Sequence, residues 1–320
     1  GEDELSNIEA TFVRGNSSGF QMIYLYNPPK NPNAPINQWC KKMEKREDCI
    51  HIHTNYRDVP VSWLGQALVA SAEAMKRADE KMYRWVWLGQ AVGVDELIYY
   101  MFGDRHRQKP DPNRRYDRIY IGGDYGQQNA TTFEAFGLDT YRKKFPGLGE
   151  YYHSGRESGR QKSPSEYAQD LVEFMNELHE QYDNRVFYIF LDPSAKGLAE
   201  EIRRATRAVS LDYQVFLRDA ENDVALGISR VQKVLSFDIM SVSPKQEYAV
   251  SEFGTYEYDK KSIEKGKEVP VKEDDHCMDA IRYCVMGAWK RLKYWLPKDE
   301  TEEIDVCDIS RKEVEDDEYL

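Results

Sequence analysis

The chain has 320 residues, of which 41% are hydrophobic and 12% aromatic, and this is enough for two globular domains with hydrophobic cores. It has no apolar run of roughly 18 residues, the length of a membrane span, and no basic-then-apolar signal pattern at its N-terminus. Composition therefore excludes a membrane-spanning protein by this criterion and predicts a cytoplasmic one. The five cysteines form no CxxC pair, which favours a reducing compartment over a disulfide framework.

The net charge of −12 is concentrated at the C-terminus. Residues 298–320 hold 11 acidic and 3 basic residues, a net charge of −8, so the preceding residues carry only −4. Basic clusters remain at residues 105–118, 142–144, 156–162 and 203–207. Such clusters are usually solvated surface, but beside a metal site they can neutralise phosphates. The charge pattern therefore permits a DNA partner without requiring one.

The first 90 residues have the pattern of an incomplete α/β domain. QMIYLYN (residues 21–27) and CIHIHTNY (residues 49–56) are rich in β-branched and aromatic residues and predict strands. Residues 63–88 have a helical pattern with aromatic anchors. Because the chain opens with no strand or core before these elements, we expect residues 1–90 to be a fragment of a larger domain.

A second unit is predicted after a linker at residues 91–117, which are rich in Asp, Pro, Asn and Arg. The predicted order from residue 118 is three antiparallel strands, then helix, strand, helix, strand, helix and a closing helix. The elements are RIYIGGDYG, TTFEAFGLD and residues 149–154, followed by helix 165–182, VFYIFLD, helix 197–208, YQVFL, helix 219–236 and helix 274–292. This order predicts an RNase H-like mixed sheet flanked by helices over residues 118–297, with an acidic tail at 298–320.

Three segments far apart in the chain each supply an aspartate in a setting that suits a metal. Asp124 and Asp192 lie at the exits of two predicted strands, and Asp279 lies on the closing helix. A single strand-end aspartate favours a structural role as a turn cap. Three converging carboxylates, however, repel one another unless cations neutralise them. Two Mg²⁺ or Mn²⁺ ions would do so, and such a pair supports phosphoryl displacement.

Two neighbours of Asp279 are further candidates. Asp275 lies four residues before it, on the same helix face, and His276 lies three residues before it. Asp275 could equally cap the helix N-terminus. His276 could be a metal ligand, an orienting group for water or a structural histidine. Three glycines beside Asp124, namely Gly122, Gly123 and Gly126, would let the backbone approach metal or DNA, although a tight turn explains them equally well.

These motifs together resemble a known family. YNPPK with the following Trp39, MYRWVWLGQAVG, GGDYG, LDPSA and DDHCMDAIRY are similar in order and spacing to the large subunit of tailed-bacteriophage terminases, in the branch that infects Gram-positive hosts. In that family an N-terminal P-loop ATPase translocates DNA into the procapsid, and an RNase H-like nuclease cuts the concatemer. The resemblance implies that residues 1–90 are the end of the ATPase domain. It also implies that Asp124, Asp192 and Asp279 bind the metals and that His276 lies near them.

The expected activity is therefore two-metal endonucleolytic cleavage of concatemeric double-stranded DNA in the host cytoplasm. The small terminase subunit and the portal protein are the further partners that the resemblance implies. The chain has no GxxxxGK[ST] loop, whose amides and lysine would hold nucleotide phosphates, so we do not expect it to hydrolyse ATP. An RNase H-like resolvase or recombinase, and a non-enzymatic packaging module with structural acids, are the alternatives.

Overall fold

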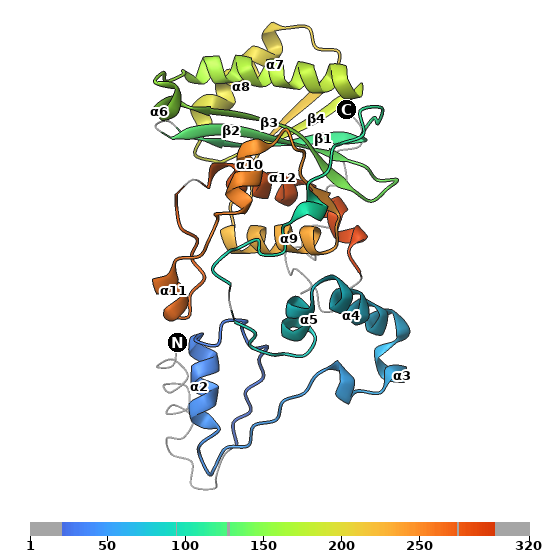
Figure 1. The fold of residues 1–320 in the computed structure, drawn as a ribbon, viewed down its shortest axis with the longest axis vertical. Helices are drawn as coiled ribbons and strands as arrows, with labels where there is room; N and C mark the ends of the chain where they lie inside the picture. The colour runs from blue at the N-terminus through green and yellow to red at the C-terminus, as the bar shows by residue number, and fades with distance from the viewer. Residues whose placement is uncertain (1–20, 94, 127–128, 274, 298–320) are drawn as a thin grey trace.

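A mixed six-stranded sheet forms the centre of the C-terminal part of the chain (Figure 1). The computed structural model describes residues 21–297 except 94, 127, 128 and 274, so the expected acidic tail lies outside the described residues. The strands are β1 (Arg118–Tyr125), β2 (Ala130–Leu138), β3 (Phe145–Ser154), β4 (Val186–Leu191), β5 (Gln214–Asp219) and β6 (Met240–Ser241). Their order across the sheet is β5-β4-β1-β2-β3-β6.

The strand directions are those of an RNase H-like sheet. β1, β2 and β3 are antiparallel neighbours, whereas β4 pairs in parallel with β1, and β5 in parallel with β4. The predicted fold class is confirmed. β6 was missed, because two residues that pair in parallel with the start of β3 are too short to leave a period-two pattern in the sequence.

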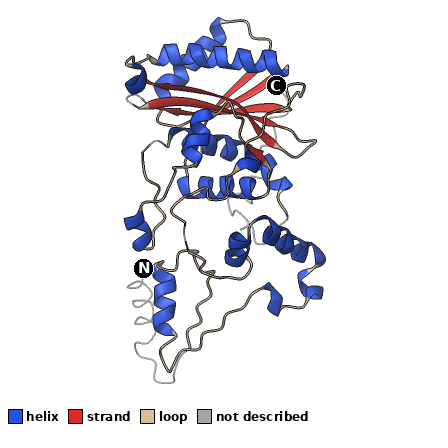
Figure 2. Cartoon of the chain, in the orientation of Figure 1, coloured by secondary structure: helices blue, strands red, loops and turns tan. Residues whose placement is uncertain are grey.

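Helices cover both faces of this sheet (Figure 2). One face carries α7 (Pro164–Tyr182) and α8 (Lys196–Ala208); the other carries α9 (Val224–Ser236), α10 (Glu247–Phe253) and α12 (His276–Leu292). Ile119 and Ile121 of β1 belong to the core on the α7 side, and Tyr120 belongs to the core on the α12 side. A strand that is buried on both faces reads as a continuous apolar run, which is why RIYIGGDYG was recognisable.

Helix boundaries follow local caps. Ser163 and Glu166 form a capping box at the start of α7, one residue earlier than predicted. The Asp223 side chain accepts a hydrogen bond from the Leu226 amide, so α9 begins at Val224 and not at the predicted 219. Short elements were not predicted: α2 (Pro35–Met43), α6 (Gly155–Ser158), α10, α11 (Lys260–Glu264), and 3-10 turns at Tyr56–Asp58, Asp104–His106 and Lys293–Trp295.

The first described part of the chain is mainly helix and loop. The helical pattern at 63–88 is confirmed as α3 (Val61–Leu64), α4 (Gln66–Ala78) and α5 (Glu80–Val86), with a break at Gly65, whose φ of 83° suits glycine. The strands predicted at 21–27 and 49–56 were wrong, since neither segment is paired with another strand in the described residues. Ile23 and Ile50 are 75% and 87% exposed. A β-pattern without a hydrogen-bonding partner cannot form a sheet.

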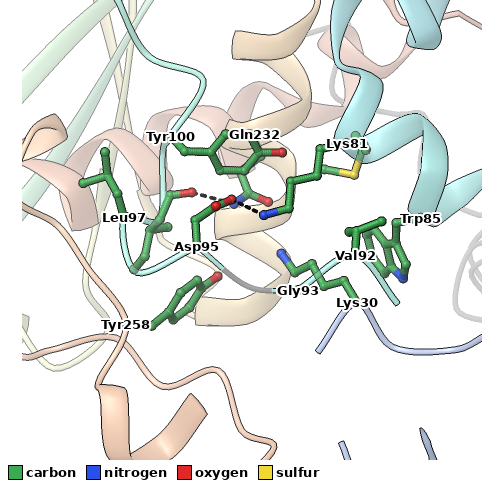
Figure 3. Close-up of a pocket in the computed structure, with 12 residues that line it drawn as sticks. Lys30, Lys81, Trp85, Val92, Gly93, Asp95, Leu97, Tyr100, Gln232 and Tyr258 are labelled. Carbon is green, nitrogen blue, oxygen red and sulfur yellow. Dashed lines mark hydrogen bonds and ion pairs between the residues drawn. The ribbon is translucent and has the colours of Figure 1, made fainter. Parts of the chain in front are cut away.

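A small pocket lies where α5 meets the segment at 92–100 and α9 (Figure 3). Lys81 of α5 forms a 2.5 Å ion pair with Asp95, and the Gln232 side chain of α9 donates to the Ile98 carbonyl oxygen at 2.7 Å. Ile98 is fully buried. The segment at 92–100 is therefore tied to the helices on both sides of it.

The Asp79 side chain accepts three hydrogen bonds at this junction. We expect Asp79→Ala to lower the free energy of unfolding by roughly 2–4 kcal/mol. Its carboxylate caps α5 at the Met82 amide, 2.9 Å away, and also accepts from the hydroxyls of Tyr100 at 2.9 Å and Ser236 at 3.3 Å. Alanine removes the cap and leaves both hydroxyls without this acceptor. Urea unfolding measures the change, with Asp212→Ala at an exposed position as the control; a loss no larger than that of the control would contradict the prediction.

Candidate active site

Asp124 and Asp192 lie side by side at the carboxyl ends of two neighbouring strands. Asp124 lies near the end of β1, and Asp192 directly follows β4, the parallel neighbour of β1. The register pairs Gly123 with Leu191, so the next residue on each strand is one of the two aspartates. Carboxyl ends of parallel strands meet at one edge of a sheet. The sheet order therefore joins two acids that are far apart in sequence.

The third acid, Asp279, reaches this edge on α12, which packs directly on β1. A Cβ atom on Gly122 would lie 1.9 Å from the carbonyl oxygen of Ala280, so only glycine allows the helix backbone to lie this close. The space beside Gly122 is filled by α12, and not by the metal, DNA or tight turn that the sequence suggested. Close packing of α12 is thus what sets the position of Asp279.

His276 and Asp275 also face the site from the start of α12. The distance from His276 Nδ1 to Asp124 Oδ2 is 2.8 Å. Lys272 Nζ lies 3.2 Å from Asp275 Oδ2 and 3.5 Å from Asp279 Oδ2. A cationic ammonium therefore sits between two carboxylates, which identifies this position as favourable for positive charge.

The capping role that we considered for Asp275 is wrong. Asp275 is the N-cap residue of α12 by position, but its side chain makes no cap hydrogen bond. Glu252 of α10 does this instead: its Oε2 accepts from the Met278 amide at 3.0 Å. Burial raises the pKa of Glu252 to about 8 even though this hydrogen bond lowers it. The Asp275 carboxylate instead forms an ion pair with Lys272.

Three residues that the sequence analysis missed hold the acids in place. Arg282, only 1% exposed, donates to Asp279 Oδ1 at 2.9 Å and to Asn222 Oδ1 at 3.2 Å. Asn222 Nδ2 donates to Asp192 Oδ2 at 3.0 Å, and the Tyr283 hydroxyl donates to the same oxygen at 2.9 Å. Arg282 and Tyr283 follow Asp279 by one helical turn, and this spacing was the available signal.

The donor set fits a hard divalent cation, because carboxylate oxygens are the ligands that Mg²⁺ and Mn²⁺ prefer. The three aspartates do not yet lie at single-ion spacing. Over the described residues, the groups of three donors within 4.8 Å of one another are Glu134–Glu150–Cys277, behind this site, and one in the N-terminal part of the chain. Lys272 and Arg282 supply positive charge beside these acids, and His276 adds to it when it is protonated.

Comparison with known proteins agrees with this architecture. Residues 124–286 match the family described as the terminase RNase H-like domain, and residues 1–90 match the phage terminase large subunit family. The chain belongs to the phage terminase large subunit family. The resemblance that the sequence motifs indicated is confirmed.

Individual relatives show how much of a terminase large subunit this chain covers. The large terminase subunit of Bacillus phage SPP1 is 30% identical over 129 residues, which are 39% of this chain and 30% of that protein. The large terminase of a thermophilic bacteriophage matches with a TM-score of 0.70 and 27% identity, over 88% of this chain and 65% of that one. The same terminase in complex with ATP-gamma-S gives a TM-score of 0.69 and 28% identity, over 88% of this chain and 66% of that one. The chain thus spans less than two thirds of these relatives.

The two strand-end acids of this terminase chain differ in their electrostatics. Burial raises the pKa of Asp124, and the hydrogen bond from His276 only partly offsets this. Burial also opposes ionisation of Asp192, but hydrogen bonds from Ser194 and Tyr283 outweigh it and hold the pKa below its usual value. The hydrogen bond to Asp124 in turn raises the pKa of His276, against its burial. The side of the site at Asp124 therefore retains protons more readily than the side at Asp192.

We expect the metal-free chain to lose stability as pH rises from about 6 to 8. The raised pKa of His276 contributes stability that is complete below its unfolded pKa and is lost as pH rises through the folded value. The raised pKa of Asp124 has the same sign, and its contribution begins to fall at lower pH, above the usual pKa of an aspartate. Urea unfolding in EDTA at both pH values measures this, and His276→Gln should show a shallower decline. Equal slopes for the two proteins would rule out His276 as the cause.

Proposed function

We propose that this chain carries the nuclease of a terminase large subunit, an endodeoxyribonuclease that hydrolyses concatemeric double-stranded DNA. The observation that supports this most is the convergence of three aspartates from β1, β4 and α12 at one edge of the sheet. Each has its own fixed hydrogen-bond partner. The proposed catalytic residues are Asp124, Asp192, Asp279, Asp275 and His276, and the proposed metal ligands are Asp124, Asp192, Asp279 and His276.

Two Mg²⁺ or Mn²⁺ ions at the aspartates would activate a water molecule and stabilise the departing 3′ oxygen of the DNA strand. The chain's own residues prepare this site. Lys272 is 61% exposed and can swing away from Asp275 and Asp279 when another cation takes its place. Arg282 is buried and keeps Asp279 aligned. Tyr283 orients Asp192 in the same way, so the acids stay in position during the exchange.

The proposed organisation follows the family. Residues 1–90 are the end of the packaging ATPase domain, 91–117 a linker, 118–297 the nuclease domain and 298–320 an acidic tail. Double-stranded DNA, the small terminase subunit and the portal protein are the proposed partners, and the host cytoplasm the proposed location. No membrane is part of the proposal, and none of the described helices combines the length and apolar character of a bilayer span.

Digestion of supercoiled and linear plasmid tests the proposal. The chain should cut both with Mn²⁺ or Mg²⁺ and neither with EDTA. Products from linear DNA should form a smear, because phosphate contacts carry no sequence information. Cleavage confined to four-way junctions would favour the resolvase alternative. No cleavage and no Mn²⁺ binding by calorimetry would favour the non-enzymatic packaging module.

A further inference from the structure

A second group of metal-binding side chains lies far from the sheet, in the N-terminal part of the chain. One donor atom each from Cys40, Glu44 and His51 lies within 4.8 Å of the others. His51 Nδ1 is 2.7 Å from Glu44 Oε1, and Cys40 Sγ is 3.8 Å from the same oxygen. A thiol, an imidazole and a carboxylate thus lie close enough together to bind a single ion.

Local structure explains why these side chains meet. Cys40 lies in α2 and Glu44 is its C-cap residue, four positions later, so both face the same side of the helix. The chain then returns as an extended loop (Figure 2). Ile50 and Ile52 of that loop are 87% and 76% exposed. Because side chains alternate along an extended chain, His51 points the opposite way, toward Glu44 at the end of α2.

The group has three donors within 4.8 Å of one another, and the nearest further donor along the chain is Cys49. Cys49 lies two residues before His51 and is half-buried with a free thiol. Two thiols, one imidazole and one carboxylate match the ligand types and the tetrahedral number that Zn²⁺ takes in structural sites. They do not match Mg²⁺ or Mn²⁺, which favour all-oxygen sets. The donor chemistry therefore separates this group from the aspartates of the candidate active site.

Few contacts hold this loop apart from the group itself: His53 Nε2 lies 2.9 Å from the Leu88 carbonyl oxygen. None of the side chains from 41 to 67 is buried, and the loop at 49–53 forms no helix or strand. Tyr56 and Leu64 pack against the core of α4 and α5, but no residue of 49–53 does, and a structural metal ion is one means of ordering such a loop. The Cys40 side, by contrast, is anchored, since Cys40 and Trp39 are buried.

We propose that Cys40, Glu44, Cys49 and His51 form a structural Zn²⁺ site that fastens the loop at 49–53 to α2. Zn²⁺ takes the place of the hydrogen between Glu44 and His51 and binds the two thiols as thiolates, whose protons are released to solvent. The site contributes order to the N-terminal part and takes no part in DNA cleavage.

Zinc binding is measured on the 320-residue chain in which Asp124, Asp192 and Asp279 are all asparagine, so that the candidate nuclease acids cannot bind the probe. After EDTA treatment and dialysis, Zn²⁺ is titrated against a chromophoric chelator, and Co²⁺ is used as a spectroscopic substitute. We expect a single tight site whose Co²⁺ spectrum shows thiolate charge transfer and tetrahedral d–d bands. A protein that binds no Zn²⁺, or whose Co²⁺ spectrum lacks thiolate bands, would overturn the proposal.

Variants at exposed positions identify the ligands without disturbing the core. His51→Ala and Glu44→Gln should each weaken Zn²⁺ binding by more than about tenfold, the effect of losing even an outer partner of a metal site. His53→Ala is the matched control: it removes a neighbouring imidazole whose Nε2 lies 2.9 Å from the Leu88 carbonyl oxygen, and it should bind Zn²⁺ as the parent does. Equal affinity of the parent and His51→Ala would refute the assignment.

Limited proteolysis reports the structural consequence independently. At free Zn²⁺ about 100 times the dissociation constant, cleavage between residues 41 and 53 should slow by about 100-fold, because Zn²⁺ lowers the population of the open loop by that factor. Cleavage in His51→Ala should not respond to Zn²⁺. The same rate with and without Zn²⁺ in the parent would show that the ion does not fasten this loop.

Discussion

We expect a loss of Mn²⁺-dependent DNA cleavage of more than about tenfold in each of three variants: Asp124→Asn, Asp192→Asn and Asp279→Asn. Loss of a residue that only supports a metal ligand costs about tenfold or more, so loss of a ligand should cost more than that. Asparagine keeps the shape and a hydrogen-bond acceptor but removes the charge that holds a divalent cation. Initial rates of plasmid nicking measure the effect. Asp275→Asn and His276→Gln should lose less activity, because Lys272 and Asp124 are their contacts in the site.

Asp219→Asn is the matched control for these variants. Asp219 also ends a strand at this edge, but its register partner is Leu191, so its side chain lies on the opposite face of the sheet from Asp192. It should cleave DNA as the parent does. If any of the three aspartate variants kept more than about a tenth of the parent rate, that aspartate would not be a metal ligand.

Alanine is a poor choice at Asp279 for a physical reason. Arg282 is 1% exposed, and its Nε and Nη1 atoms have no hydrogen-bond partner in the described structure. Removal of the Asp279 carboxylate leaves this buried guanidinium without its counter-charge, which costs about 3–5 kcal/mol. Loss of activity in Asp279→Ala would therefore combine unfolding with metal loss. Asparagine also removes the counter-charge but keeps a hydrogen-bond acceptor for Arg282 Nη2, so urea unfolding of Asp279→Asn measures how much of its loss of activity comes from a weakened fold.

Gly122→Ala is expected to lower the free energy of unfolding by about 3 kcal/mol, at the upper end of overpacking effects. The new methyl group would lie 1.9 Å from the Ala280 carbonyl oxygen and 3.1 Å from Cys284 Sγ. The nearest obstacle is helix backbone, which cannot rotate away as a side chain can. α12 must shift from β1, and Asp279 moves with it. The free energy of unfolding, measured in urea, and the rate of plasmid cleavage should both fall.

Gly197→Ala provides the comparison. Gly197 lies in α8, and a Cβ atom there meets nothing within 4 Å. Alanine is the better helix former at such a position by roughly 0.5–1 kcal/mol, so this variant should be slightly more stable and fully active. A Gly122→Ala protein as stable as Gly197→Ala would mean that α12 does not pack on β1 as described.

Local sequence determined the positions of the strand-end acids and of the closing helix. Asp124 and Asp192 lie at the ends of short apolar runs that pack against a core on each face of the sheet, and that pattern extends over only a few neighbouring residues. The spacing of Asp275 and Asp279 similarly places both on one side of α12 whatever α12 packs against. These predictions needed no knowledge of other segments, since backbone geometry alone sets them.

Tertiary structure decided everything that depends on a partner distant in sequence. The apolar patterns at 21–27 and 49–56 are strand-like but unpaired in the described residues, because a strand is stable only with a neighbour to accept its hydrogen bonds. Arg282 reads as an ordinary helix residue, yet the packing of α12 against α9 buries it beside Asn222 and Asp279. Gly122 gains its role from the Ala280 carbonyl oxygen on α12. Propensity acts between neighbours along the chain, whereas these contacts arise only once the sheet order has brought the segments together.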